Sequence, residues 1–301
     1  MARQLTDDQR LALINKWKTP PGASEQDRLE RAERMVKDAI NQHEAFQGPE
    51  ITVEAKGSYP NKTNVRGDSD VDIMVKLNDP FHTDGMAAWY FGQPNQFTGP
   101  WTAATLRKEV HTALAAYFGS VDADHNLAFY VPEVIGSRPS IDVVPCFKWV
   151  QYDSTAPGGA YVGSVVYGRD GTRVINWPEL QLANGRAKNT NTKYRYKFVV
   201  RVLKNVENDL AAEGVIKPLP SYFSECLIYN VRDDIFLSGG LDDAVRACLV
   251  EVHRQVSSFW SLLCMREPNQ RKKLFGDGQK WNAFHARELI EGAWRYLGYG
   301  G

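Results

Sequence analysis

The stretch that decides the fold runs from Lys56 to Leu77 and reads KGSYPNKTNVRGDSDVDIMVKL. Asp70 and Asp72 occupy alternate positions in it and lead directly into an apolar run. Because residues i and i+2 of a β-strand point to the same face, these two carboxylates are expected side by side on a strand. Neighbouring carboxylates repel each other unless a cation lies between them. The stretch therefore predicts a strand that carries a cation site.

A third acid and a turn extend this pattern. Asp142 lies within a second apolar run, IDVVPCF, and Gly57-Ser58 precedes Asp70 by eleven intervening residues. Glycine lets the backbone approach a phosphate closely, and a serine hydroxyl can bond its oxygens. Three carboxylates on adjacent strands can hold two Mg²⁺ ions roughly 4 Å apart, the arrangement that serves in-line phosphoryl displacement. The alternative is that the two acids mark a solvated strand edge and that Gly57-Ser58 is a plain loop.

Composition narrows the class of protein. The chain has 301 residues, of which 43% are hydrophobic, enough for one large domain or two smaller ones. Lys+Arg and Asp+Glu both number 36, and this balance argues against extended binding to nucleic acid or to a membrane surface. No apolar signal region opens the chain, and no stretch approaches the length of a membrane span. We therefore expect a cytoplasmic protein.

The four cysteines are widely spaced and form no C-x-x-C pair. This spacing favours reduced, mostly buried thiols over a zinc site or disulfides. The cysteines are Cys146, Cys226, Cys248 and Cys264.

Hydrophobic periodicity divides the chain into two halves. The first half alternates strands and helices, and the second is mainly helical after a loop-rich segment at 151–164. The expected elements of the first half are a helix over 24–46 with Ser24 as N-cap, strands over 51–56 and 71–77, a helix over 102–117, and strands within 126–131 and 139–147. The expected helices of the second half lie within 192–214, 221–231, 241–263 and 281–298, the first of them ending at Gly214.

The residues around the acids carry a family resemblance. GSYPNKTNVRGDSDVDIMV looks like the signature of the polymerase-β-like nucleotidyltransferase superfamily. More narrowly, it resembles the bacterial cGAS/DncV-like enzymes (CD-NTases), which cyclise nucleotides in the CBASS anti-phage defence. IDVVPCF, the segment 175–205 and LPSYFSECLIYNV resemble that family in order and spacing, over roughly residues 24–265. Within the family the chain looks most like the E clade (CdnE-like).

The resemblance implies an α+β fold. It would comprise a polymerase-β-like nucleotidyltransferase core of mixed sheet and helices, residues 1–165, with the N-terminal helix as a spine. A mainly helical lobe, residues 166–301, would complete the nucleotide pocket across a cleft.

The resemblance also implies roles for individual residues. Asp70, Asp72 and Asp142 would be ligands of two Mg²⁺ ions, for which Mn²⁺ can substitute, and Asp142 would take the proton of the acceptor hydroxyl. Asp68 departs from the family pattern. Of the alternating acids Asp68, Asp70 and Asp72, that pattern requires only the second and the third. The residues expected to bind the donor nucleotide are Lys56, Gly57, Ser58, Asn176, Lys204, Ser221 and Tyr222.

Plainer interpretations of four of these residues stay open. The alternative for Lys204 is a place on the solvated face of an amphipathic helix. Ser221 can be the N-cap of the helix that it opens, and Tyr222 can be a core residue. Asn176 either caps the WPEL turn or offers its amide to a pyrimidine edge. A second D-x-D pair, Asp122 and Asp124, is interpreted as a turn without function.

The sequence thus predicts a template-independent nucleotidyltransferase that condenses NTPs into a cyclic oligonucleotide, most simply a pyrimidine-containing dinucleotide. A downstream effector protein would bind this second messenger. The alternatives are an RNA-tailing or protein-modifying transferase and an inactive nucleotide-binding relative. Gly300-Gly301 would suit the C-terminal conjugation known in some family members, and a frayed terminus is the plainer interpretation.

Overall fold

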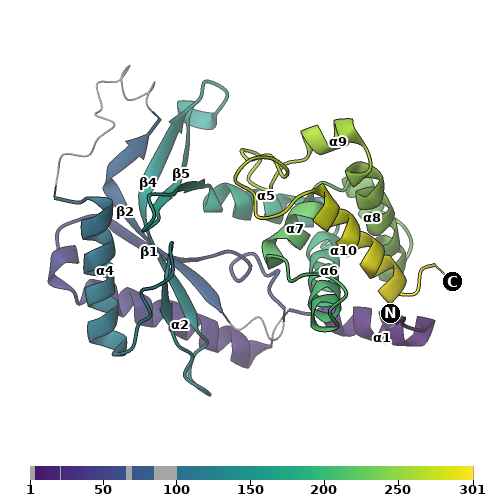
Figure 1. The fold of residues 1–301 in the computed structure, drawn as a ribbon, viewed down its shortest axis with the longest axis horizontal. Coiled ribbons are helices and arrows are strands. Elements are labelled where there is room, and N and C mark those ends of the chain that lie inside the picture. Colours follow the sequence, from purple (N-terminus) through teal and green to yellow (C-terminus); the bar gives the residue numbers. More distant parts are fainter. Residues whose placement is uncertain (1–3, 21, 66–69, 85–99, 301) are drawn as a thin grey trace. The chain divides into compact units, whose positions relative to one another are not determined.

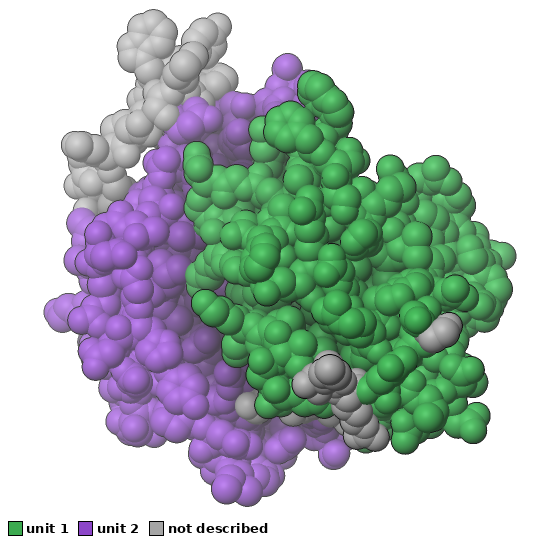
Figure 2. Space-filling model, turned by 45° about the vertical axis from the view of Figure 1, so that its right-hand side comes forward, with its two compact units in different colours: residues 1–21, 60–68, 180–301 green, residues 22–59, 69–179 purple. Residues whose placement is uncertain are grey.

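The computed structural model describes residues 4–20, 22–65, 70–84 and 100–300. The expectations for Asp68 and Gly301 therefore lie outside the described residues. The chain forms two compact units, coloured separately in Figure 2. The α/β unit consists of Gly22–Tyr59 and Ser69–Glu179, and the helical unit of Met1–Pro21, Pro60–Asp68 and Leu180–Gly301.

These units differ from the contiguous halves expected from the sequence. The expected boundary at residue 165 falls inside β5 (Ala160–Tyr167), which pairs with β6 (Arg173–Asn176) and so keeps both strands in the sheet. The N-terminal residues belong to the helical unit, because Leu5 donates its backbone N–H to the carbonyl of Tyr296 and is buried in that unit's core. Long-range packing thus overrides the order of the chain.

A mixed six-stranded sheet builds the α/β unit, as expected. Its order is β1-β2-β4-β5-β6, and β3 pairs with β4 beside β5. Among the described strand pairs, β2 and β4 run parallel and the others run antiparallel. The remaining bounds are β1 (Ile51–Lys56), β2 (Val71–Thr83), β3 (Phe129–Val131) and β4 (Ile141–Tyr152).

Two helices pack on one side of this sheet, and Figure 1 shows both beside it. These are α2 (Ala23–Asn41) and α4 (Ala103–Phe118). Val71, Ile73 and Val75 of β2 are each at most 1% exposed, as the alternation in the sequence predicted. Burying these branched side chains removes apolar area from water and fixes which face of β2 carries the acids.

Several predicted boundaries were wrong. The first long helix starts at Ala23 with Gly22 as its N-cap, so Ser24 does not cap it, and it ends at Asn41 before a separate 3₁₀ turn, Glu44–Phe46. Strand β2 continues past Leu77, where the pairing with β4 changes register. The predicted loop at 151–164 contains the start of β5. Sequence periodicity does not predict where strands β2 and β5 begin and end, because their pairing depends on strands distant in the sequence.

The helical unit surrounds α6, whose buried face includes Val202, Val206 and Leu210. Gly214 follows the end of this helix with φ +69°, a conformation that favours glycine and stops the helix as expected. The helices, labelled where space allows in Figure 1, are α1 (Asp7–Trp17), α5 (Pro178–Asn191), α6 (Arg195–Ala212), α7 (Ser221–Tyr229), a 3₁₀ helix (Asp233–Leu237), α8 (Leu241–Val256), α9 (Phe259–Cys264) and α10 (Ala283–Tyr296).

Among the described helices, none has both the length and the apolar character needed to cross a membrane. All four cysteines are free thiols, and Cys264 alone among them is exposed. Burial raises the pKa of the Cys146 thiol to about 12, so this side chain stays protonated and packs as an apolar group.

Candidate active site

Strand pairing aligns charged side chains across the sheet of the α/β unit. Lys56 on β1 pairs with Asp72 on β2, and Asp72 pairs in turn with Asp142 on β4. Because cross-strand partners point to the same face of a sheet, these three side chains form one row. The row brings together three residues that lie far apart in the sequence, as the predicted metal and phosphate chemistry requires.

Asp70 lies just before β2, two residues from Asp72. Its carboxylate accepts a hydrogen bond from the hydroxyl of Ser140, and the Val71 amide donates to the carbonyl of Ser140 at 3.0 Å. The entrance of β2 is thereby fixed to the entrance of β4. No local pattern indicates this role of Ser140, because it depends on the parallel register of the two strands.

Asp142 is more buried than Asp70 and Asp72. Burial raises the pKa of its carboxyl, and Asp72 and Asp70 raise it further, whereas His125 and Lys56 oppose the shift. Its Oδ1 atom is buried and has no hydrogen-bond partner in the described structure. A buried, unpaired carboxylate oxygen is costly to the folded state, and it is typical of a site that a ligand completes.

Gly57 explains how the turn approaches the acids. It has φ +76°, and a Cβ at this position would lie 2.9 Å from the Oδ2 atom of Asp72. Glycine is therefore needed both for the backbone conformation and for the space beside the carboxylate. Ser58 follows in the same turn and is half-buried. The turn thus runs directly beside the carboxylate row, where phosphate oxygens are expected.

The donor set suits Mg²⁺ bound jointly with a substrate. Carboxylate oxygens are the ligands that Mg²⁺ prefers, and this ion usually completes its shell with phosphate oxygens and water. Within the described residues, no three His, Cys, Asp or Glu side chains converge closely enough to hold a metal ion by themselves. The unpaired oxygen of Asp142 and the exposed carboxylates of Asp70 and Asp72 leave coordination positions for a nucleotide to share.

The comparisons with known proteins identify the family. Residues 183–298 match the family described as the cGAS/DncV-like nucleotidyltransferase C-terminal helical domain. The cyclic dipyrimidine nucleotide synthase CdnE of Legionella pneumophila is 34% identical over 291 residues, covering 94% of this chain and 96% of that protein. The chain belongs to the cGAS/DncV-like nucleotidyltransferases.

Other relatives of this nucleotidyltransferase carry different product names. The cyclic dipurine nucleotide synthase of Elizabethkingia meningoseptica is 30% identical over 95% of the chain and 97% of that protein. The structure of the Rhodothermus marinus CdnE c-UMP-AMP synthase with Apcpp and Upnpp has a TM-score of 0.80 and 27% identity, covering 94% of both chains. Overall similarity therefore establishes the enzyme class and leaves the choice of base to individual residues.

Asn176, the candidate base-reading residue, ends β6 at some distance from the acids. It pairs with Ser164 of β5, which pairs with Lys148 of β4 on the face that carries Asp142. Lys148 lies six residues beyond Asp142, about 20 Å along an extended strand. This spacing separates Asn176 from the acids, and its contact with a base stays a prediction. Glycine at 163 permits this pairing, since a Cβ there would collide with the carbonyl of Asn176.

In the helical unit, Lys204 departs from the plainer interpretation. Only 1% of this residue is exposed, so it does not lie on the solvated face of α6. A buried lysine is uncommon unless its charge is compensated. Burial raises the pKa of the Cys226 thiol, and the charge of Lys204 opposes that shift. The burial of Lys204 therefore fits an anion-binding residue better than a solvated surface lysine.

Ser221 and Tyr222 open helix α7. The N-cap of this helix is Pro220, so Ser221 is its first helical residue and the capping interpretation was wrong. The Tyr222 hydroxyl donates to Glu267 at 3.2 Å, and its half-buried ring meets Trp281 edge-on. Burial raises the pKa of Tyr222 well above its usual range. The contacts with Glu267 and Trp281 thus hold the ring of Tyr222 in place.

A buried charge network in the same unit was missed from the sequence. Glu225 is 1% exposed and accepts hydrogen bonds from Asn61 at 2.5 Å and from Thr63 at 2.7 Å. Arg201 donates to the backbone carbonyls of Lys18 and Lys62. The network fixes residues 60–65, the continuation of the Gly57-Ser58 turn, to the helices. No local motif indicates this network, because Glu225 lies over 160 residues from Asn61 and Thr63 in the sequence.

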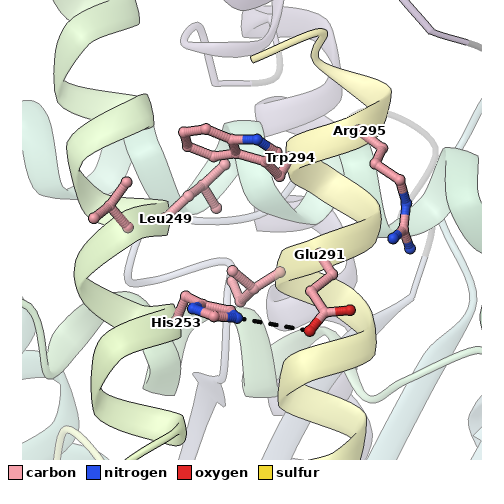
Figure 3. Close-up of a pocket in the computed structure, with 7 residues that line it drawn as sticks. Leu249, His253, Glu291, Trp294 and Arg295 are labelled. Atoms are coloured by element: carbon pink, nitrogen blue, oxygen red, sulfur yellow. Dashed lines mark ion pairs between the residues drawn. The ribbon is translucent and has the colours of Figure 1, made fainter. Parts of the chain in front are cut away.

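A cavity of ≈ 340 Å³ lies between α8 and α10 and contains none of the predicted site residues. Leu249 and Trp294 form apolar walls, and His253 faces Glu291 across the opening at 3.6 Å (Figure 3). The cavity has neither the acids nor the glycine turn that nucleotide transfer requires. The carboxylate row of the α/β unit remains the candidate active site.

Proposed function

We propose that this protein condenses NTPs into a cyclic dinucleotide that contains at least one pyrimidine, most simply UMP. The observation that carries the proposal is the pairing of Asp72 with Asp142 across adjacent strands. Asp70 lies just before the first of these strands, and the Gly57 turn lies beside Asp72. The row supplies the groups for phosphoryl transfer. The extent of the match to cyclic nucleotide synthases supports cyclisation, because it includes both units rather than a shared motif alone.

In each transfer, the acceptor hydroxyl oxygen forms a bond to the α-phosphorus of an NTP, the bond to the bridging oxygen breaks, and pyrophosphate leaves. Asp142 accepts the hydroxyl proton. Ser58 donates to the donor phosphates. When two Mg²⁺ ions are bound by Asp70, Asp72 and Asp142, they lower the pKa of the hydroxyl and neutralise the leaving group.

Lys204, Ser221, Tyr222 and Asn176 are the other residues proposed to contact the nucleotide. Lys204 and Ser221 bind its triphosphate, and Tyr222 stacks on its base. Asn176 offers one donor and one acceptor, which match the paired acceptor and donor on a pyrimidine edge. A buried amide left unpaired by the wrong base penalises that base.

Two further proposals concern partners. A separate effector protein binds the cyclic product, as expected for a diffusible messenger. Conjugation through the C-terminal glycine requires a short accessible end. Tyr299, close to that glycine in the sequence, is anchored by a 2.6 Å hydrogen bond to Asp242 and by Arg10 over its ring.

The decisive experiment is incubation of the purified protein with all four NTPs and Mg²⁺ or Mn²⁺, followed by phosphatase treatment and mass spectrometry. We expect a phosphatase-resistant cyclic dinucleotide that contains UMP. An all-purine cyclic product would overturn the base assignment and keep the enzyme class. Extension of a labelled RNA, without a small cyclic product, would indicate a tailing enzyme instead.

A further inference from the structure

A stacked aromatic pair continues the carboxylate row beyond Asp142. Tyr130 on β3 is the cross-strand partner of Asp142, and Asp122 is bridged to Tyr130 in turn. Cross-strand partners share a face, so the row runs from Lys56 through the two aspartates to Tyr130. Phe129 and Val131, the neighbours of Tyr130 on β3, are buried on the opposite face. Tyr130 therefore points to the side of the sheet on which the acids lie.

The imidazole of His125 stacks on Tyr130. The ring centroids are 5.9 Å apart and the planes differ by 9°. His125 Nε2 lies 3.8 Å from Asp122 Oδ2, and both side chains are about half exposed, at 50% and 47%. Aromatic pairs inside a core are covered on their outer faces, whereas this pair keeps accessible aromatic surface beside charged groups. Such a surface is suited to a planar, polar ligand.

The loop that carries His125 is held from behind. Arg107 donates to the carbonyls of Ala123, His125 and Ala128, and its guanidinium lies 4.4 Å over the Phe129 ring. The interpretation of Asp122 and Asp124 as a turn is confirmed, since Asp122 Oδ1 accepts from the Asp124 amide at 2.8 Å.

A second arginine fixes the same loop. Arg169 donates to the carbonyl of Ala123 at 2.9 Å and to Asp124 at 3.3 Å. Arg107 and Arg169 thus order the loop by donating to its backbone carbonyls, and the loop exposes the ring of His125. This ordering lowers the entropic cost of binding a ligand against that ring.

We propose that His125, stacked on Tyr130, is the platform for the base of the acceptor nucleotide, whose hydroxyl faces Asp142. The inference rests on the proposed function. A base stacked on this pair holds the sugar hydroxyl beside the row, and stacking tolerates any base because each has a π-face. The same platform retains the linear intermediate between the first transfer and ring closure. His125 and Tyr130 act as positioning residues and leave base selection to other groups.

The test uses three substitutions at position 125 in the full-length protein with NTPs and Mg²⁺. His125→Ala should raise KM for NTP roughly 5-fold or more and increase the share of linear dinucleotide released. His125→Phe keeps an aromatic ring and should restore both values towards wild type. His125→Asn keeps a polar group without the ring and should resemble Ala. Glu133→Ala, at an exposed residue that follows β3, is the control.

Melting temperatures separate a positioning role from a role in folding. All four variants should melt close to wild type, because His125 and the control residue are both exposed. A wild-type KM and product ratio for His125→Ala would overturn the platform, as would equal rescue by Asn and Phe. Failure of the wild-type protein to release pyrophosphate from NTPs would instead overturn the proposed function, and the platform with it.

Discussion

The two units use charge in opposite ways. In the α/β unit, Asp70 and Asp72 are exposed and Asp142 keeps a buried oxygen without a partner in the described structure. In the helical unit, Glu225 is buried and satisfied by Asn61 and Thr63. Uncompensated like charges destabilise a fold and await a ligand, whereas compensated buried charges hold a fold together. The comparison separates groups kept for chemistry from groups kept for structure.

The strongest test of this division removes the two exposed acids. Asp70→Ala/Asp72→Ala should lower pyrophosphate release about 10³-fold or more, since the charge stabilisation that they provide is worth several kcal/mol. Thermal stability should hold or rise because mutual repulsion is relieved. Pyrophosphate assays and melting curves measure both. Asp234→Ala, a surface acid of the helical unit, is the control, and undiminished product from the double variant would contradict the metal assignment.

Glu225→Ala tests the opposite behaviour. Removing this buried acceptor should destabilise the protein by about 3–5 kcal/mol, because Asn61 and Thr63 lose their partner in a buried site. Urea denaturation measures the change. Glu291→Ala breaks the half-exposed pair with His253 and should cost less than about 1 kcal/mol. Equal stability of the two variants would show that the buried network is not structural.

Lys204 lies between the two categories, because it is buried in the helical unit and is expected to bind phosphate. Lys204→Met retains the apolar stem, so the melting temperature should change little, whereas KM for NTP should rise about 10-fold through loss of a charge-assisted contact. Lys204→Arg keeps the charge and serves as the control. A collapse of the melting temperature with an unchanged KM would assign Lys204 to the fold.

Asn176 tests whether base choice is separate from the acids. Asn176→Ser should shift the product towards purines by a factor of about 10 or less, with the total rate of pyrophosphate release preserved. Mass spectrometry of the cyclic products measures the ratio. Ser164→Ala, at its strand partner, is the control. An unchanged base composition in the Asn176 variant would remove the residue from base recognition.

Asp142→Asn should have a small effect on the stability of the fold, and the sign of that effect is diagnostic. The pKa of Asp142 is raised in the folded protein, so its contribution to stability is full below its ordinary pKa of 3.8 and is lost as pH rises through the folded value. Without Mg²⁺ or nucleotide, the variant should melt a few °C above wild type at most near neutral pH and coincide with it below pH 3.8.

The control for that variant has the opposite sign. Arg232 lowers the pKa of the exposed Asp234 carboxyl, so Asp234→Asn should lose a little stability near neutral pH. Melting curves from pH 3 to pH 8 in EDTA measure both variants. A lower melting temperature for Asp142→Asn would mean that its carboxylate stabilises the fold rather than awaiting a ligand.

The sequence by itself determined the elements whose pattern is local. The alternation around Asp72 placed apolar side chains on one face of β2, and the glycine at 57 marked the turn beside the acids. The order of motifs identified the enzyme family before any contact was known. These features are readable because period-two alternation and backbone conformation depend on neighbouring residues.

Only the tertiary structure decided which distant groups meet. It drew the N-terminus and residues 60–65 into the helical unit, buried Lys204, and satisfied Glu225 from a loop over 160 residues away. It also placed Tyr130 beside Asp142 and stacked His125 on Tyr130. The turn formed by Asp122 and Asp124 supports this pair. Strand register and helix packing create these neighbours, and neither leaves a periodic trace in the chain.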